Sequence, residues 1–243
     1  MGSPPVKKGM RNSENSFLPT RRSVLGLLAA TAVHGQTSQP AGTQPQRSPR
    51  QDADTVFLFV RLAHSDRSLD KVAEMVAQEP KLVYATWDWG GGDWETGLGG
   101  AAHTGSHKMA RFLLEKGARI DAYCAAMLGQ HDVVAALVAA GPEVVNARGP
   151  HGYSLLYHAA GSGDVAIVEL LKPHLAAPAR DFNQALSAAV RDGHAPMTRW
   201  LLENGVTDPN QGDGFAKRPL VAALQNGFND VAEELRKHGA TEQ

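Results

Sequence analysis

Apolar and small residues recur along this chain at fixed distances from five glycines. Alanine stands four residues before each glycine, an apolar residue stands four residues after it, and leucine stands eight residues after it. Positions four residues apart lie on one face of a helix, so each glycine is expected to separate two short amphipathic helices. The five reference glycines are Gly105, Gly129, Gly163, Gly193 and Gly227.

A second set of glycines lies twelve residues after four of these reference points: Gly117, Gly141, Gly205 and Gly239. We expect both sets to end helices in the left-handed conformation, which glycine adopts at little cost. A single helix pair cannot bury its apolar face, whereas stacked pairs can. The pattern therefore predicts an all-α fold of stacked helix pairs, with Cys124 and Trp200 among the packed residues.

These columns resemble the ankyrin repeat. The first half of that repeat, TPLHxAAxxGH, is similar to TGLGGAAHTG at 96–105 and SLLYHAAGSG at 154–163. The second half, VVxxLL followed by Gly-Ala, is similar to MARFLLEKGA at 109–118 and MTRWLLENG at 197–205. The resemblance spans about 54–240. It implies an ankyrin-repeat solenoid of about six helix pairs with short hairpin fingers.

The chain departs from the repeat in two ways. The histidine of the motif is absent from every unit, and the short spacing between Gly105 and Gly129 leaves no room for a hairpin between them. Residues 54–80 look like a degenerate first unit that caps one end of the stack, and the unit that ends at Gly239 would cap the other.

The N-terminus has the pattern of an export signal. Arg21 and Arg22 precede a short apolar stretch that ends in small residues, and TRRSVL resembles a twin-arginine signal peptide. The apolar stretch is about half the length that a membrane span needs. We therefore expect a signal peptide at 1–35, starting at Met1 or Met10, then a Gln- and Pro-rich disordered linker at 36–53 and the repeat domain at 54–243.

Charge and cysteine content narrow the function classes. Five of the 24 bases and one of the 25 acids lie in residues 1–35, so the remainder carries 19 bases against 24 acids, a formal charge of −5. A mildly acidic body disfavours nucleic-acid binding, which needs a basic surface. The single cysteine excludes an intramolecular disulfide and a cysteine-rich metal site.

One segment interrupts the regular pattern with unusual chemistry. TWDWGGGDWET at 86–96 holds three of the four tryptophans. The interval from Ala85 to Thr96 is eleven residues, whereas the equivalent interval from Ala147 to Ser154 is seven, so this segment has four additional residues. The sequence therefore predicts an enlarged hairpin finger at this position, followed by the glycine-rich start of the next helix.

Four interpretations of the finger compete. A phosphate-binding loop is disfavoured because GLGGAA follows no buried strand. A catalytic or metal site could use Asp88, Asp93, Glu95, His103 and His107, if about three of them converged. Recognition is favoured, because exposed tryptophan is enriched at binding hot spots. The remaining interpretation is that the tryptophans cover an apolar edge of the first unit.

The ankyrin resemblance also implies contact positions, namely the two residues before each reference glycine. We expect at least one finger tryptophan to be well exposed and to face the same side as His103. The candidate partner-binding surface comprises Trp87, Asp88, Trp89, Asp93, Trp94, Glu95, His103, Thr104, Met127, Leu128, Arg191, Asp192, Gln225 and Asn226.

The sequence predicts a periplasmic or secreted, non-enzymatic binding module without a cofactor or a resident metal. Its partner would be a protein, with an exported enzyme as one candidate by analogy, and neither nucleic acid nor a stable membrane anchor is expected. Two alternatives stay open. One is an enzyme, metal or carbohydrate site at the 87–95 finger with His103 and His107, and the other is an immunity or inhibitor protein for a toxin or hydrolase.

Overall fold

The computed structural model describes residues 51–212 and 218–242. The predicted signal peptide and all but the end of the predicted linker lie outside these residues. Within them, no helix is both long enough and apolar enough to cross a bilayer.

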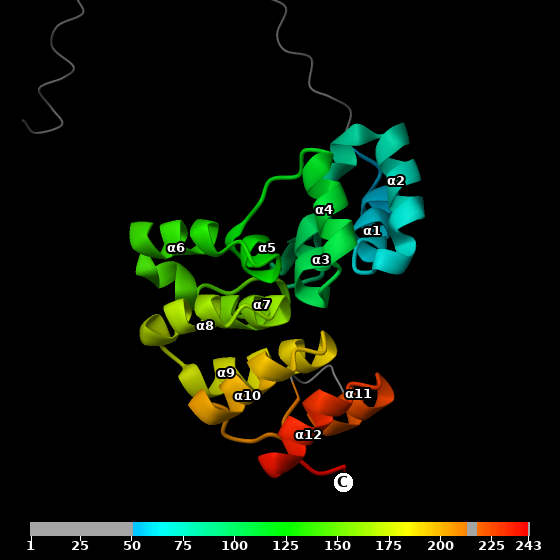
Figure 1. Ribbon diagram of the computed structural model, residues 1–243. Helices are drawn as coiled ribbons and strands as arrows, with labels where there is room; N and C mark the ends of the chain where they lie inside the picture. The colour runs from blue at the N-terminus through cyan, green and yellow to red at the C-terminus, as the bar shows by residue number, and fades with distance from the viewer. Residues whose placement is uncertain (1–50, 213–217, 243) are drawn as a thin grey trace, which may run out of the picture. The chain divides into compact units, whose positions relative to one another are not determined.

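The described part of the chain is mostly helical and contains twelve α-helices, shown in Figure 1. They are α1 (Ala53–Leu62), α2 (Leu69–Gln78), α3 (Gly97–Thr104), α4 (His107–Glu115), α5 (Ala122–Met127), α6 (His131–Ala140), α7 (Leu155–Ser162), α8 (Val165–Leu171), α9 (Pro178–Arg191), α10 (Ala195–Asn204), α11 (Pro219–Gln225) and α12 (Asn229–Lys237). Five short 3₁₀ turns are η1 (Asp66–Ser68), η2 (Pro80–Tyr84), η3 (Pro142–Asn146), η4 (Pro150–Gly152) and η5 (Lys172–His174).

Strands are confined, in the described residues, to one small hairpin. Strand β1 (Thr86–Asp88) pairs antiparallel with β2 (Trp94–Thr96), and Trp87 lies opposite Glu95 in the register. The predicted finger is therefore a hairpin placed directly before α3. The equivalent segment later in the chain forms a single bridge between Arg148 and Ser154.

All five reference glycines adopt the left-handed conformation, with φ between +70° and +76°. At four of the five, the residue after the glycine returns a hydrogen bond to the alanine column, as from the Ser106 N–H to the Ala101 carbonyl (2.9 Å). This closure satisfies carbonyls that the end of a helix would otherwise leave unpaired. The alanine column thus contributes both a small side chain and a backbone acceptor.

The second set of glycines follows the expectation only in part. Gly117 and Gly239 have positive φ, but Gly141 and Gly205 are extended, with φ of −168° and 172°. A left-handed helix end at these two positions is therefore wrong. Gly205 is required for a different reason, because a Cβ there would lie 2.6 Å from the Phe182 ring.

Helices on the two sides of the reference glycines form two sets of contacts. Along one side α3 packs on α1 and α5, α7 packs on α5 and α9, and α11 packs on α9. Along the other, α8 contacts α6 and α10, and α10 contacts α12. Each helix that precedes a reference glycine thus lies beside the corresponding helix of the neighbouring unit (Figure 1).

The core is built from the predicted columns, with two exceptions in α6, where Val133 and Leu137 are both exposed. The alanine column, Cys124 and four of the five leucines are completely buried, and Trp200 is partly buried, with its ring stacked on Phe182. Leu137 is 37% exposed, because α6 buries Val134 and Val138 in its place. The prediction that Leu137 belongs to the core is therefore wrong, and the apolar face of α6 is rotated by about one residue.

Candidate functional site

Glycines shape the hairpin that begins the site. Gly90, Gly91 and Gly92 all have positive φ, and the tip is closed by the Asp88 carboxylate, which accepts the Gly90 N–H (2.9 Å). Three successive residues of this kind are costly for any residue with a Cβ, so the glycine run is what permits the enlarged tip. The tip thereby places Asp93 and Glu95 against the helices behind it.

The two faces of the hairpin have different environments. Trp87 and Glu95 lie on one face, and Trp89 joins them by donating its indole N–H to Glu95 Oε2 (2.7 Å). Trp94 alternates to the other face, where it is 61% exposed and lines a second, smaller pocket with Tyr123 and Arg148. One finger tryptophan is thus well exposed, as expected, but the prediction that this residue faces His103 is wrong.

Glu95 is the centre of a cluster of three histidines that come from three separate segments. Its side chain is almost completely buried, and its Oε2 lies 3.1 Å from His64 Nε2 and 3.6 Å from His151 Nε2. Its Oε1 lies 2.9 Å from His103 Nδ1. We call His64, Glu95, His103 and His151 the His–Glu cluster, and each of its members offers a possible metal-ligand atom within 4.8 Å of the others.

Each histidine of the His–Glu cluster also contacts an oxygen through its Nδ1. His64 Nδ1 is 2.8 Å from the Val60 carbonyl, and His103 Nδ1 is 3.3 Å from the Gly99 carbonyl. His151 Nδ1 lies 2.7 Å from one carboxylate oxygen of Asp93, and its backbone N–H donates to the other (2.9 Å). These contacts fix the ring orientations, and those of Asp93 also hold His151 at a positive φ of 58°.

Burial and ion pairing oppose each other at the cluster. Burial alone would raise the pKa of Glu95, but the adjacent imidazoles of His103 and His64 outweigh it and lower that pKa to about 2. Burial acts against the charged form of His64, but Glu95 outweighs it and raises the pKa of His64. For His103 burial prevails and lowers the pKa. The carboxylate is therefore charged, while the imidazoles differ in their affinity for a proton.

The glycine-rich start of α3 serves close packing rather than phosphate binding. A Cβ on Gly97 would lie 2.7 Å from the Phe59 ring, and a Cβ on Gly100 would lie 2.8 Å from the His64 ring. The run therefore lets α1 approach α3 closely enough for His64 to reach Glu95.

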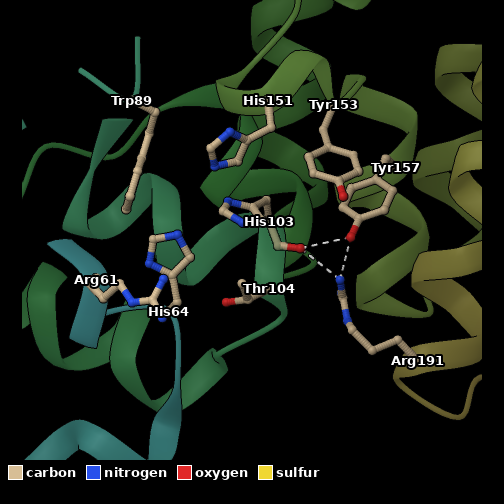
Figure 2. A pocket seen from close by; sticks show the side chains of 9 residues that line it. All are labelled: Arg61, His64, Trp89, His103, Thr104, His151, Tyr153, Tyr157 and Arg191. Carbon is tan, nitrogen blue, oxygen red and sulfur yellow. Dashed lines mark hydrogen bonds between the residues drawn. The ribbon is translucent and has the colours of Figure 1, made fainter. Parts of the chain in front are cut away.

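A pocket of about 450 Å³ opens beside the cluster, and Figure 2 shows how its side chains converge from the hairpin, α1, α3, α7, α9 and the segment at 150–153. Its lining residues are Arg61, His64, Trp89, His103, Thr104, His151, Tyr153, Tyr157 and Arg191.

Arg191 of α9 forms one wall of the pocket, where its side chain contacts residues of α3 and α7. Its guanidinium donates to the His103 carbonyl (2.7 Å) and to the Tyr157 hydroxyl (2.6 Å), as Figure 2 shows. It also pairs with Asp192. Burial disfavours its charge, but Asp192 and Tyr157 outweigh burial and raise its pKa. The Tyr157 ring stacks on Tyr153 at 4.1 Å, so the wall is both aromatic and cationic.

The structure brings only part of the predicted surface together. Trp89, His103, Thr104 and Arg191 line the pocket, and Asp93, Glu95 and Asp192 lie directly behind its wall. Met127 is completely buried, so its predicted contact role is wrong. The remaining predicted residues do not line the pocket: Trp87, Asp88, Trp94, Leu128, Gln225 and Asn226.

His107 also stands apart from the His–Glu cluster, so the predicted pairing of His103 with His107 at one site is wrong. The left-handed Gly105 reverses the chain between the two histidines and places them on different helices. Sequence reasoning missed Arg61, His64, His151, Tyr153 and Tyr157. His151 alone had a signal, because it occupies the turn equivalent to the tryptophan hairpin.

Residues 122–211 match the family model for ankyrin repeats (3 copies). The match covers α5 to α10, and the hairpin and the helices α1 to α4 lie outside it. A search of curated proteins found no match for the chain.

Proposed function

We propose that this chain is an exported, non-enzymatic ankyrin-repeat protein whose domain at 54–243 forms a solenoid of about six helix pairs and binds a protein partner. Ankyrin repeats indicate a protein–protein interaction module, and domains built from them are typically non-enzymatic. The helix contacts described above support a continuous stack, since each unit lies beside the next.

The observation that carries the proposal is the composition of the pocket. It combines Trp89 of the hairpin with His103, Thr104 and Arg191 from the positions that precede two reference glycines. The tryptophan hairpin and the positions before the reference glycines, which lie apart in the sequence, therefore border one concave surface. Aromatic rings and arginine are the side chains most enriched at hot spots, and a concave surface lined by them fits a protruding side chain of a partner.

Export is proposed on the sequence of the leader alone. Replacing Arg21 and Arg22 together by lysine should retain the protein in the cytoplasm with its leader uncleaved, as measured by cell fractionation and mass spectrometry. An unchanged yield in the periplasm would argue for another export route.

Partner binding is tested in two stages. Affinity capture from cell-envelope fractions first identifies a candidate, and the purified candidate is then titrated against variants by calorimetry. Two hairpin-face variants are used: Arg61→Ala alters the pocket that borders one face of the hairpin, and Trp94→Ala alters the opposite face. Lys71→Ala, which changes an exposed residue of α2 outside the pocket lining, is the matched control.

We expect Arg61→Ala to weaken binding by about 2 kcal/mol, or roughly 30-fold in Kd, as at a hot spot. The Kd of Lys71→Ala should stay within about twofold of the wild-type value, because exposed ion pairs such as Lys71–Glu74 contribute little. Equal affinities for the wild type and the two hairpin-face variants would exclude this surface.

A further inference from the structure

We infer that the His–Glu cluster is a binding site for a divalent zinc-type cation, with His64, Glu95, His103 and His151 as the four ligands. This inference goes beyond the proposed protein-binding function and does not depend on it. The ion would join the turn after α1, β2, α3 and η4, four segments that otherwise meet through side-chain packing.

The spacing of the donor atoms fits tetrahedral coordination. A zinc ion with bonds of about 2.0–2.1 Å separates neighbouring ligand atoms by roughly 3.3 Å. Glu95 Oε1 lies 2.9 Å from His103 Nδ1, and Oε2 lies 3.1 Å from His64 Nε2 and 3.6 Å from His151 Nε2. All four donors lie within 4.8 Å of one another, so the side chains would close slightly around an ion.

The contacts on the outer side of two of the rings, His64 and His151, support the same assignment. An Nδ1–H that donates to Val60 or Asp93 leaves a lone pair on Nε2 of His64 or His151, and both Nε2 atoms point at the Glu95 carboxylate. In a neutral ring this lone pair faces the carboxylate unfavourably, and a bound cation, like a proton on Nε2, would remove the repulsion. Metal-bound histidines in proteins are held in the same way, by a carboxylate or a backbone carbonyl on the second nitrogen.

A buried oxygen without a hydrogen bond provides an independent observation. Glu95 is 1% exposed, and its Oε1 has no hydrogen-bond partner. The contact with His103 Nδ1 has the distance of a hydrogen bond but not its angle. Leaving a charged oxygen buried in this way is costly, whereas coordination to a cation would satisfy it.

The donor set also indicates which metal would bind. Three imidazoles suit zinc and its transition-metal neighbours, while calcium and magnesium prefer oxygen ligands. Four protein donors complete a tetrahedron, which is the arrangement of structural zinc sites. Three of the ligands also line the pocket, so an ion has a path from solvent.

The balance of charge is consistent with a divalent ion. Glu95 and Asp93 supply two negative charges at the cluster, and neutral imidazoles add none. Two arginines, Arg61 and Arg191, face the same pocket, and Arg191 is paired with Asp192. A divalent cation would neutralise Glu95 and Asp93 together.

The test uses the full chain, purified without an affinity tag and stripped of metal. Zinc chloride is added, unbound metal is removed by dialysis, and the bound metal is measured by elemental analysis. Titration followed by tryptophan fluorescence gives the affinity, because Trp89 donates to Glu95 and should report on binding. We expect one zinc per chain, a higher melting temperature with zinc, and no such effect of calcium or magnesium.

Variants separate this site from adventitious binding. Glu95→Gln and His151→Ala should each lower zinc affinity at least 100-fold, and Asp93→Asn should lower it about 10–100-fold, as loss of an outer contact does. His131→Ala, which alters a histidine outside the cluster, should bind zinc like the wild type. If Glu95→Gln does not fold, His151→Ala decides, since His151 lies in a partly exposed turn.

Substoichiometric zinc in the wild type, or equal affinity in the wild type and His151→Ala, would overturn the inference. Neither result would bear on the protein-binding proposal, which Arg61→Ala and Trp94→Ala test without added metal.

Discussion

The region that the ankyrin model matches and the region before it use side chains in different ways. In residues 122–211, repeated alanine, leucine and glycine columns build an apolar interior. In residues 51–117 an apolar core is also present. Beside it, a buried carboxylate, two tryptophans and histidines from α3 and from the turn after α1 converge at one hairpin. The repeats thus form a regular apolar scaffold, and the buried charged and aromatic side chains are concentrated in the region that precedes it.

The largest effect is expected when buried leucine side chains of the repeats are shortened, because the repeats depend on their apolar interior. Leu171→Ala and Leu201→Ala should each lower the free energy of unfolding by about 2–5 kcal/mol, because both side chains are completely buried. Leu137→Ala is the matched control, as the same column position is 37% exposed, and it should cost far less. Denaturant unfolding measures all three, and equal losses would show that the assigned burial is wrong.

Acid should destabilise the repeat region through His158. Burial lowers the pKa of this completely enclosed imidazole from 6.5 to about 3. The unfolded chain then binds a proton that the folded chain excludes, so stability is full above pH 6.5 and falls as the pH decreases from 6.5 toward 3. The loss attributable to His158 should be roughly 2 kcal/mol between pH 6.5 and pH 5.

The measurement is the difference in unfolding free energy between the wild type and His158→Gln at several pH values. The variant should be less stable at neutral pH but should lack this part of the acid dependence. Parallel pH curves for the two proteins would show that His158 is not held neutral.

Substituting one glycine in each region by alanine tests how much backbone strain each region would take up. Gly193→Ala should cost about 2 kcal/mol, because φ is +76° and the added Cβ would lie 3.0 Å from the Phe228 ring. Gly91→Ala at the hairpin tip should cost about 1 kcal/mol, because φ is also positive but no atom lies within 4 Å of the added Cβ. Thermal unfolding of the two variants tests the order, and a larger loss at Gly91 would contradict it.

The smallest effect is expected at the exposed face of the hairpin. Trp94→Ala should change the unfolding free energy by no more than about 0.5 kcal/mol, since most of the side chain is in solvent. Trp89→Ala should cost more, because it removes the indole donor from the buried Glu95 carboxylate. Acrylamide quenching should decrease clearly when Trp94 is removed and little when Trp89 is removed.

The sequence predicted the helical fold well, because the repeat depends on local chemistry. A left-handed glycine and an apolar column at helical spacing carry their meaning in a few neighbouring residues, as at Gly163 and Leu171. The burial of Leu137 was wrongly predicted because a small rotation of α6 buries Val138 in its place, and the spacing of apolar residues in the sequence is the same in both cases. The hairpin was also predictable, from the additional residues around Gly91.

The candidate site was predictable only in part. Trp89, Glu95 and His103 lie close together in the chain and could be recognised as a group. His64 and His151 reach Glu95 through tertiary packing, and nothing in their own neighbourhood indicates that they converge. The sequence also could not predict which face of the hairpin each tryptophan occupies. That depends on the strand register, and the enlarged tip leaves the register open.

Arg191 has a consequence for the cooperativity of unfolding. Repeat stacks in general are nearly one-dimensional, so their units can unfold one after another from the ends. Here the guanidinium of Arg191, at the end of α9, hydrogen-bonds the carbonyl of His103 in the last turn of α3, and the two residues are 88 positions apart. That bond passes over the units of Gly129 and Gly163 and links two units that are not neighbours. The segment from α3 to α9 should therefore open as one cooperative block, with uniform amide hydrogen exchange, while α11 and α12 fray independently.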